Sequence, residues 1–137
     1  ILGKITPNIT FWGFEYGDIL GTYLESLART YDMDIDHLFS SHRFLVEDHR
    51  KRIEELYAHH EHRLDEARDI LKRADRTTVR DVARQLQWDI RSRGWDDFPA
   101  SQKWFAVGEA HSHLEHLRAI GDAEMEEEDG ILYYKSV

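Results

Sequence analysis

Residues 99–121 read PASQKWFAVGEAHSHLEHLRAIG, and this stretch decides how the C-terminal half of the chain folds. Proline suits the first turn of a helix and glycine suits the residue that follows its end, so Pro99 and Gly121 predict a helix that runs to Ile120. Residues three and four positions apart share one face of a helix, and we expect the apolar face to be buried. This face comprises Trp104, Val107, His111, Leu114 and Leu117.

Two further helices are expected before this one, and a β-hairpin after it. A long helix is predicted from about Val46 to Arg73, where apolar residues recur at helical spacing. Thr78 and Asp81 form a capping-box-like start for the next helix, and Asp129-Gly130 indicates a tight turn between two strands. Three helices followed by a hairpin is the order of a winged helix. We therefore place a winged-helix domain at residues 46–137.

The first 45 residues do not follow that pattern. Residues 1–17 are expected to be extended, and Asp18 can cap a helix that continues to about Tyr31. The run HLFSS, residues 37–41, resembles a short strand that leads to His42, and it requires a larger sheet for stability. The chain as a whole is thus predicted to be α+β and mainly helical.

The bulk composition restricts the function. The 137 residues suffice for one domain, or for a small domain and a piece of another. With no cysteine, the chain cannot form disulfides, thiolate zinc sites or thiol nucleophiles, which fits a cytoplasmic protein. No apolar run approaches the length of a membrane span, so no membrane partner is expected. A net charge of −9 argues against a general nucleic-acid binder.

Five segments occur in a distinctive order: ILGKITPNIT, YLESLARTYDMDIDHLFSSHR, RIEELYAHHEHRL, WDDFPASQKWFAVGEAHSHLEHLRAIG and GILYYKS. Their order and spacing resemble the C-terminal part of bacterial metallo-β-lactamase-fold hydrolases with an appended winged-helix domain. These enzymes are relatives of the glyoxalase II-like and lactamase-like-protein-2 enzymes. The resemblance implies that residues 1–45 are the C-terminal remnant of a four-layer αββα catalytic sandwich.

The resemblance also gives His42 a role. A lone histidine after a strand is ordinarily a surface or hydrogen-bonded residue, but position 42 matches the metal ligand that ends the last strand of this family's catalytic domain. Arg43 stands where a glycine is usual. In the intact parent, His42 would bind zinc, expected as a dinuclear centre, and zinc-bound water could attack an ester or thioester.

The same resemblance implies that part of the enzyme is missing from this chain. The family motif His-x-His-x-Asp-His has no match here. We therefore expect a C-terminal fragment, whose partner is the missing N-terminal part of its own catalytic domain. A single imidazole cannot hold zinc tightly, so the fragment alone is predicted to be inactive and to carry no tightly bound zinc.

Aromatic residues are concentrated in the segment FWGFEY, residues 11–16. They can form the wall of a pocket for an apolar substrate group, or they can simply cover the core, and both interpretations stay open. The pocket candidates are Phe11, Trp12, Phe14 and Tyr16.

Two histidine-rich segments, HHEH at 59–62 and HSHLEH at 111–116, raise the possibility of a metal site. His59 and His62 share a helix face, as do His113 and His116. The more ordinary interpretation places His60 and His111 in the core and the other members of the two segments in solvent.

The predicted hairpin is strongly acidic. Such a wing would repel phosphate, so we expect no nucleic-acid partner and a structural or assembly role for the domain. The rival hypotheses are an acidic winged-helix interaction module without enzymatic activity and a winged-helix transcription factor.

The first 45 residues should also expose apolar side chains, including Phe11, Trp12, Phe39 and the face of the helix from Asp18. Self-association through this N-terminal third, most simply as a two-fold dimer, is therefore expected. The alternative is that residues 1–17 are disordered and that the helix from Asp18 folds back onto residues 46–137.

Overall fold

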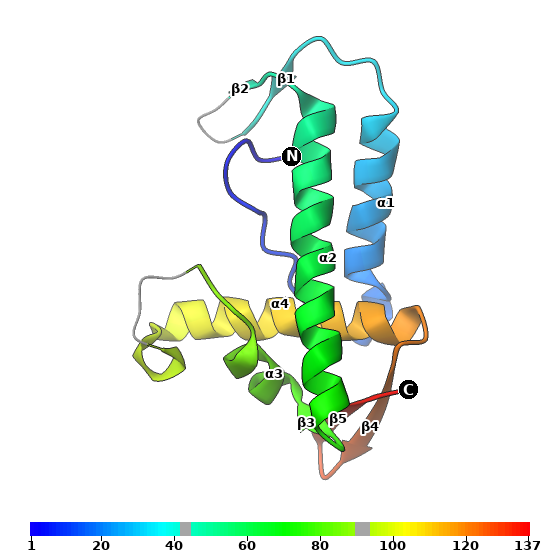
Figure 1. Ribbon diagram of the computed structural model, residues 1–137, viewed down its shortest axis with the longest axis vertical. Coiled ribbons are helices and arrows are strands. Elements are labelled where there is room, and N and C mark those ends of the chain that lie inside the picture. The colour runs from blue at the N-terminus through cyan, green and yellow to red at the C-terminus, as the bar shows by residue number, and fades with distance from the viewer. Residues whose placement is uncertain (42–44, 90–93) are drawn as a thin grey trace.

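The computed structural model describes residues 1–41, 45–89 and 94–137. Its helices are α1 (Ile19–Tyr31), α2 (His49–Arg73), α3 (Val79–Gln85) and α4 (Ala100–Ala119), with single turns of 3-10 helix at Phe14–Tyr16 and Trp95–Asp97. In Figure 1, α1 and α2 lie side by side and antiparallel, while α4 crosses them and the small sheet lies near the end of α2. None of the described helices combines the length and apolar character that a membrane crossing demands.

A three-stranded antiparallel sheet follows the order β3–β5–β4. Its strands are β3 (Thr77–Thr78), β4 (Ala123–Glu128) and β5 (Ile131–Ser136). The predicted hairpin is confirmed, since Glu128 pairs with Ile131 across a two-residue turn. Asp129 and Gly130 both have positive φ, 53° and 76°, as this tight turn requires. The short strand β3, which pairs with β5 through Thr77 and Tyr134, was not predicted.

A second, two-stranded sheet joins β1 (Leu38–Phe39) to β2 (Leu45–Val46). The strand expected at residues 37–41 is thus confirmed in its centre. The strand was expected to need a larger sheet, but among the described residues its partner is the equally short β2.

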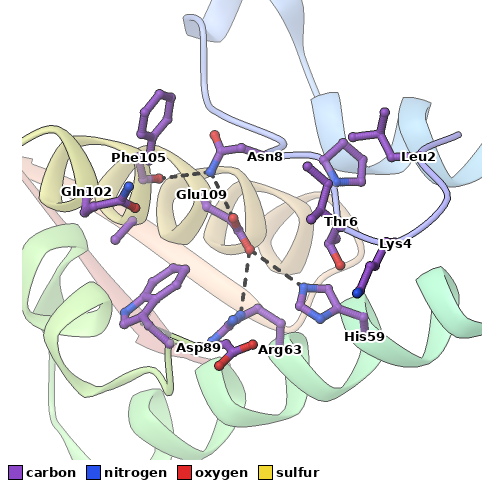
Figure 2. Close-up of a pocket in the computed structure, with 14 residues that line it drawn as sticks. Leu2, Lys4, Thr6, Asn8, His59, Arg63, Asp89, Gln102, Phe105 and Glu109 are labelled. Carbon is purple, nitrogen blue, oxygen red and sulfur yellow. Dashed lines mark hydrogen bonds and ion pairs between the residues drawn. The ribbon is translucent and has the colours of Figure 1, made fainter. Parts of the chain in front are cut away.

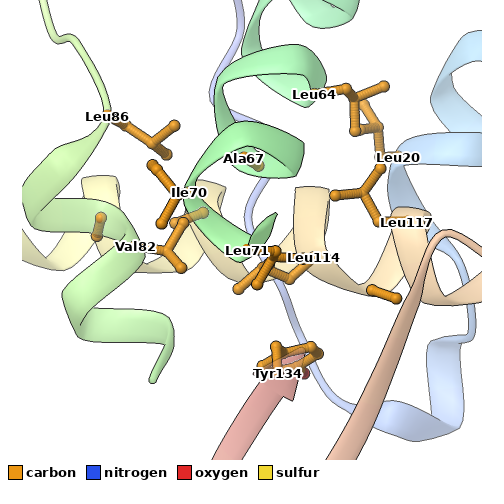
Figure 3. Close-up of a cluster of buried hydrophobic side chains, with 13 residues drawn as sticks. Leu20, Leu64, Ala67, Ile70, Leu71, Val82, Leu86, Leu114, Leu117 and Tyr134 are labelled. Atoms are coloured by element: carbon orange, nitrogen blue, oxygen red, sulfur yellow. The ribbon is translucent and has the colours of Figure 1, made fainter. Parts of the chain in front are cut away.

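The core lies where α1, α2, α3 and α4 meet the face of β5 (Figure 3). Leu20 of α1, Leu64 of α2, Val82 of α3 and Leu114 of α4 all lie in this cluster with Tyr134 of β5, and each is almost wholly removed from solvent. Helix α1 therefore packs against the helices of residues 46–137. Of the two arrangements considered for it, the structure has the one in which it folds back.

Several burial expectations are wrong. Trp104 was expected on the buried face of α4, yet 62% of it is exposed, because the inward face there is formed by Ala106 and Glu109. His113 was expected in solvent but is fully buried, and His116 is half-buried against Asp18. The apolar face of α1 is covered, with Leu20 and Leu27 buried, rather than exposed.

Candidate binding cleft

A cleft of about 590 Å³ lies between the N-terminal segment, residues 2–8, and the helices α2 and α4. Trp88 and Asp89, which follow α3, line it as well. Figure 2 shows the polar side chains of these elements converging on the carboxylate of Glu109.

The N-terminal segment is fixed as one wall of this cleft by hydrogen bonds to its backbone. The Arg52 guanidinium of α2 donates to the carbonyl oxygens of Leu2, at 2.8 Å, and Ile5, at 3.1 Å. Farther along, the Phe11 amide donates to the Gly108 carbonyl oxygen of α4 at 3.0 Å. Gly108 permits this close approach, because a Cβ there would overlap the Thr10 hydroxyl oxygen.

The floor of the cleft is an ion pair between Arg63 of α2 and Glu109 of α4. Both are largely buried, with 7% and 8% of their surface exposed. Glu109 accepts a hydrogen bond from Asn8 Nδ2 at 2.9 Å, while its other oxygen lies 3.8 Å from Arg63 Nε and 4.0 Å from His59 Nε2. Both of these last two distances are too long for hydrogen bonds, and the contact with Arg63 is an ion pair.

The Arg63 guanidinium is held by its other contacts. Its Nη1 donates to the Gln87 carbonyl oxygen and to Glu66 Oε2, and the guanidinium lies over the Trp88 ring at 4.3 Å. Trp88 is fixed in turn, since its indole N–H donates to the Ala83 carbonyl oxygen at 2.8 Å. Arg63 is thereby prevented from rotating to shorten its contact with Glu109.

Glu109 is ionised at neutral pH. Burial opposes its ionisation, but the contact with His59 and the nearby positive charge of Arg63 outweigh burial and hold the pKa of this carboxyl below its usual range. Glu109 can therefore accept hydrogen bonds at neutral pH but is not poised as a general acid.

Two buried histidines lie behind this floor. His60 Nδ1 and His113 Nε2 are 3.1 Å apart, and His113 Nδ1 is 2.8 Å from the Glu109 carbonyl oxygen. Because a carbonyl oxygen only accepts, His113 Nδ1 carries the proton, and neutral His113 must then accept at Nε2 from His60. Burial lowers the pKa of His60 to about 3 and that of His113 to about 4.

The predicted site residues that the structure describes are not brought into this cleft. His42 lies outside the described residues. Phe11 packs on α4, where its ring stacks on His111 with centroids 3.7 Å apart, and Phe14 meets Phe11 edge-on at 5.1 Å. Trp12 and Tyr16 are exposed. Whether these four aromatic residues line a substrate pocket stays a prediction.

The histidine-rich segments do not come together as a metal site in the described part of the chain, where no group of three or more His, Asp or Glu side chains could hold an ion. His60 is in the core, as expected, and His111 bonds the Tyr134 hydroxyl at 3.0 Å. The residues seen here therefore do not fit a catalytic zinc by themselves.

Two solved structures are similar to this chain. One is a β-lactamase domain protein from Burkholderia ambifaria, with a TM-score of 0.75 and 29% identity over 95% of this chain and 37% of that one. The other is a metallo-β-lactamase family protein from Thermus thermophilus, with a TM-score of 0.74 and 28% identity over 98% of this chain and 39% of that one. No protein-family model and no curated protein sequence matches.

The chain therefore has the fold of one part of a metallo-β-lactamase family protein. It spans less than two fifths of the length of either solved structure. The similarity to the metallo-β-lactamase fold that the five sequence segments predicted is therefore confirmed, as far as the fold is concerned.

Sequence reasoning missed the cleft and its floor. Neither Arg63 nor Glu109 was singled out as a site residue. A signal did exist: Arg63 lies three residues after His60, and Glu109 four residues before His113, so both charged residues fall on helix faces that bear core residues.

Proposed function

We propose that this chain is the C-terminal part of a zinc-dependent metallo-β-lactamase-fold hydrolase that acts on esters or thioesters. In this proposal, residues 1–45 complete the catalytic domain and residues 46–137 form a winged helix with a structural role. The observation that carries it is the similarity to a β-lactamase domain protein and a metallo-β-lactamase family protein over 95% and 98% of the chain.

Zinc would be held jointly by His42 and by ligands that precede this chain. Further ligands would be required, because a catalytic zinc is held by three or more protein ligands and His42 supplies one. The chain's own contribution would be one ligand and a scaffold.

The coding sequence that precedes Ile1 tests the proposal directly. It should encode a His-x-His-x-Asp-His motif within one catalytic domain's length. A start codon immediately before Ile1 would contradict the proposal and favour the rival, an acidic interaction module.

The full-length protein provides the second test. It should bind zinc and hydrolyse model esters or thioesters, and His42→Ala should lower both the zinc content and the activity. His62→Ala is the matched control, because His62 is exposed on α2. Equal zinc content and activity in wild type and His42→Ala would show that His42 is not a zinc ligand.

The acidic hairpin supports the rival. The exposed carboxylates of β4 include Glu124, Glu126 and Glu128, and a surface of this kind suits a basic protein partner. An assay of ester and thioester hydrolysis by the purified full-length protein distinguishes the hydrolase from the interaction module.

A further inference from the structure

We propose that the cleft between residues 2–8, α2 and α4 binds a small neutral molecule that carries a hydroxyl or amide group on an apolar body. This inference does not depend on the proposed hydrolase function, because described residues alone form the cleft.

The geometry of the ion pair between Arg63 and Glu109 indicates that the ligand carries a hydroxyl or amide group. Arg63 Nε has no hydrogen-bond acceptor among the described residues, and it lies 3.8 Å from Glu109 Oε1. Arg63 Nε is shielded from solvent in this arrangement, so a hydroxyl or amide that accepts from Nε–H and donates to Glu109 Oε1 must displace the covering side chains slightly. A buried polar group left unpaired is costly, so a ligand that pairs it gains affinity.

The charge of the floor argues for a neutral ligand. Arg63 and Glu109 are of opposite charge and almost equally buried. A cationic head at their contact would meet Arg63, and an anionic head would meet Glu109, and either would lose most of its hydration on entry.

The walls of the cleft fit an apolar body. The side chains of Trp88, Phe105, Ile5 and Pro7 line it around the polar floor. Its volume of about 590 Å³ lies within the range of small-molecule sites, which are mostly apolar with a few convergent polar groups.

Five probes of one size test this by NMR: benzamide and benzyl alcohol, with benzoate, benzylammonium and toluene as comparisons. The Arg63 Nε–H and Trp88 indole signals report on the cleft. Benzamide or benzyl alcohol should shift both signals saturably, and the other three should bind about tenfold more weakly or worse, since each leaves a buried group unpaired. No saturable shift with either neutral polar probe, or equal binding of toluene or a charged probe, would overturn the proposal.

Two variants and one control localise the binding. Phe105→Ala should weaken benzamide binding by about fivefold, because it removes one aromatic wall. Phe39→Ala should not change it, since Phe39 is an exposed aromatic on β1 outside the cleft. Glu109→Gln removes the negative charge, so benzoate should then bind better than it binds the wild type. Unchanged binding in Phe105→Ala, or unchanged selectivity in Glu109→Gln, would place the ligand elsewhere.

Discussion

His60 and His113 form the most deeply buried ionisable pair that the structure describes. Both side chains are fully removed from solvent, and protonation of either would place a positive charge beside Arg63 without a partner in water. Since the backbone carbonyl oxygen of Glu109 fixes the tautomer of His113, the pair has one defined arrangement while both rings are neutral.

We expect the fold to lose stability as the pH falls below about 6.5, the ordinary pKa of histidine in the unfolded chain. Below this pH the two histidines bind protons in the unfolded state but stay neutral in the folded state, because burial lowers their folded pKa values to about 3 and about 4. Each histidine should therefore remove roughly 1.4 kcal/mol of stability per pH unit until its folded pKa is reached. Urea unfolding at several pH values measures this loss.

Single substitutions separate this pair from other titrating groups. His60→Leu should flatten the pH dependence, whereas His62→Gln, a change at an exposed position of α2, should leave it unchanged. NMR should show the His60 and His113 ring signals unchanged as the pH falls through 6.5, because burial keeps both rings neutral. A His60 signal that titrates near pH 6.5 would contradict the assignment.

At the residue level, the sequence predicted apolar core positions better than charged ones. Leu114 and Leu117 are buried as the helical spacing indicates. Arg63 and Glu109 were missed because burial of a charge depends on a partner from a distant helix, which periodicity within one helix cannot reveal. Trp104 failed for a related reason: nothing in the described structure packs over its end of the face.

Helix ends were predicted well because their signals are local. Asp18 caps α1 by accepting from the Gly21 amide at 2.8 Å, and Thr78 caps α3 by accepting from the Asp81 amide at 3.2 Å. The strands β2 and β3 were missed, since two residues carry no alternating pattern and are defined only by their distant pairing partners.

Asp18 should contribute more stability than an ordinary cap. Besides capping α1, its Oδ2 lies 2.8 Å from His116 Nδ1 of α4, so one side chain joins two helices. Asp18→Ala should cost about 1–2 kcal/mol for the cap, with a further loss for the contact to His116. Thermal or urea unfolding measures the difference.

Asp48 offers a matched control at the start of α2. It is exposed and accepts from the Lys51 amide at 3.0 Å, a contact within its own helix. Asp48→Ala should therefore cost only the cap, about 1 kcal/mol. Equal losses in the two variants would show that the contact between Asp18 and His116 adds nothing.

At the scale of the whole molecule, the charge of the hairpin β4–β5 sets which partners are possible. Glu124 and Glu126 both pair with Lys135, at 3.2 and 2.6 Å, so the positive charge of Lys135 is already paired within the hairpin. The hairpin therefore presents acidic groups to any approaching polymer.

The protein should not shift duplex DNA in a mobility assay at about 0.15 M salt, where such binding depends on cationic contacts. Changing Glu126, Glu127 and Glu128 together to lysine should produce binding that weakens as salt is added. Micromolar binding by the unaltered protein would contradict this expectation.

Self-association through the N-terminal third stays a prediction. Fewer apolar side chains are exposed there than the sequence indicated. Helix α1 is covered, but Trp12 and Phe39 are 69% and 83% exposed. Light scattering should detect a dimer, and Trp12→Ser with Phe39→Ser should shift it to monomer. Deleting residues 1–45 would not be a clean test, because Leu20 belongs to the main core. A monomer at high concentration in the unaltered protein would disprove the dimer.

The contact of residues 8–11 with α4 has a consequence for the order in which the molecule is made. Asn8 and Phe105 are 97 positions apart, yet the Asn8 amide donates to the Phe105 carbonyl oxygen at 3.3 Å. A ribosome delivers the N-terminal segment first, so its docking site does not exist until α4 has left the exit tunnel. During that interval these residues lack their partner on α4. The cleft is therefore complete only after α4 has emerged, although residues 8–11 were made long before it.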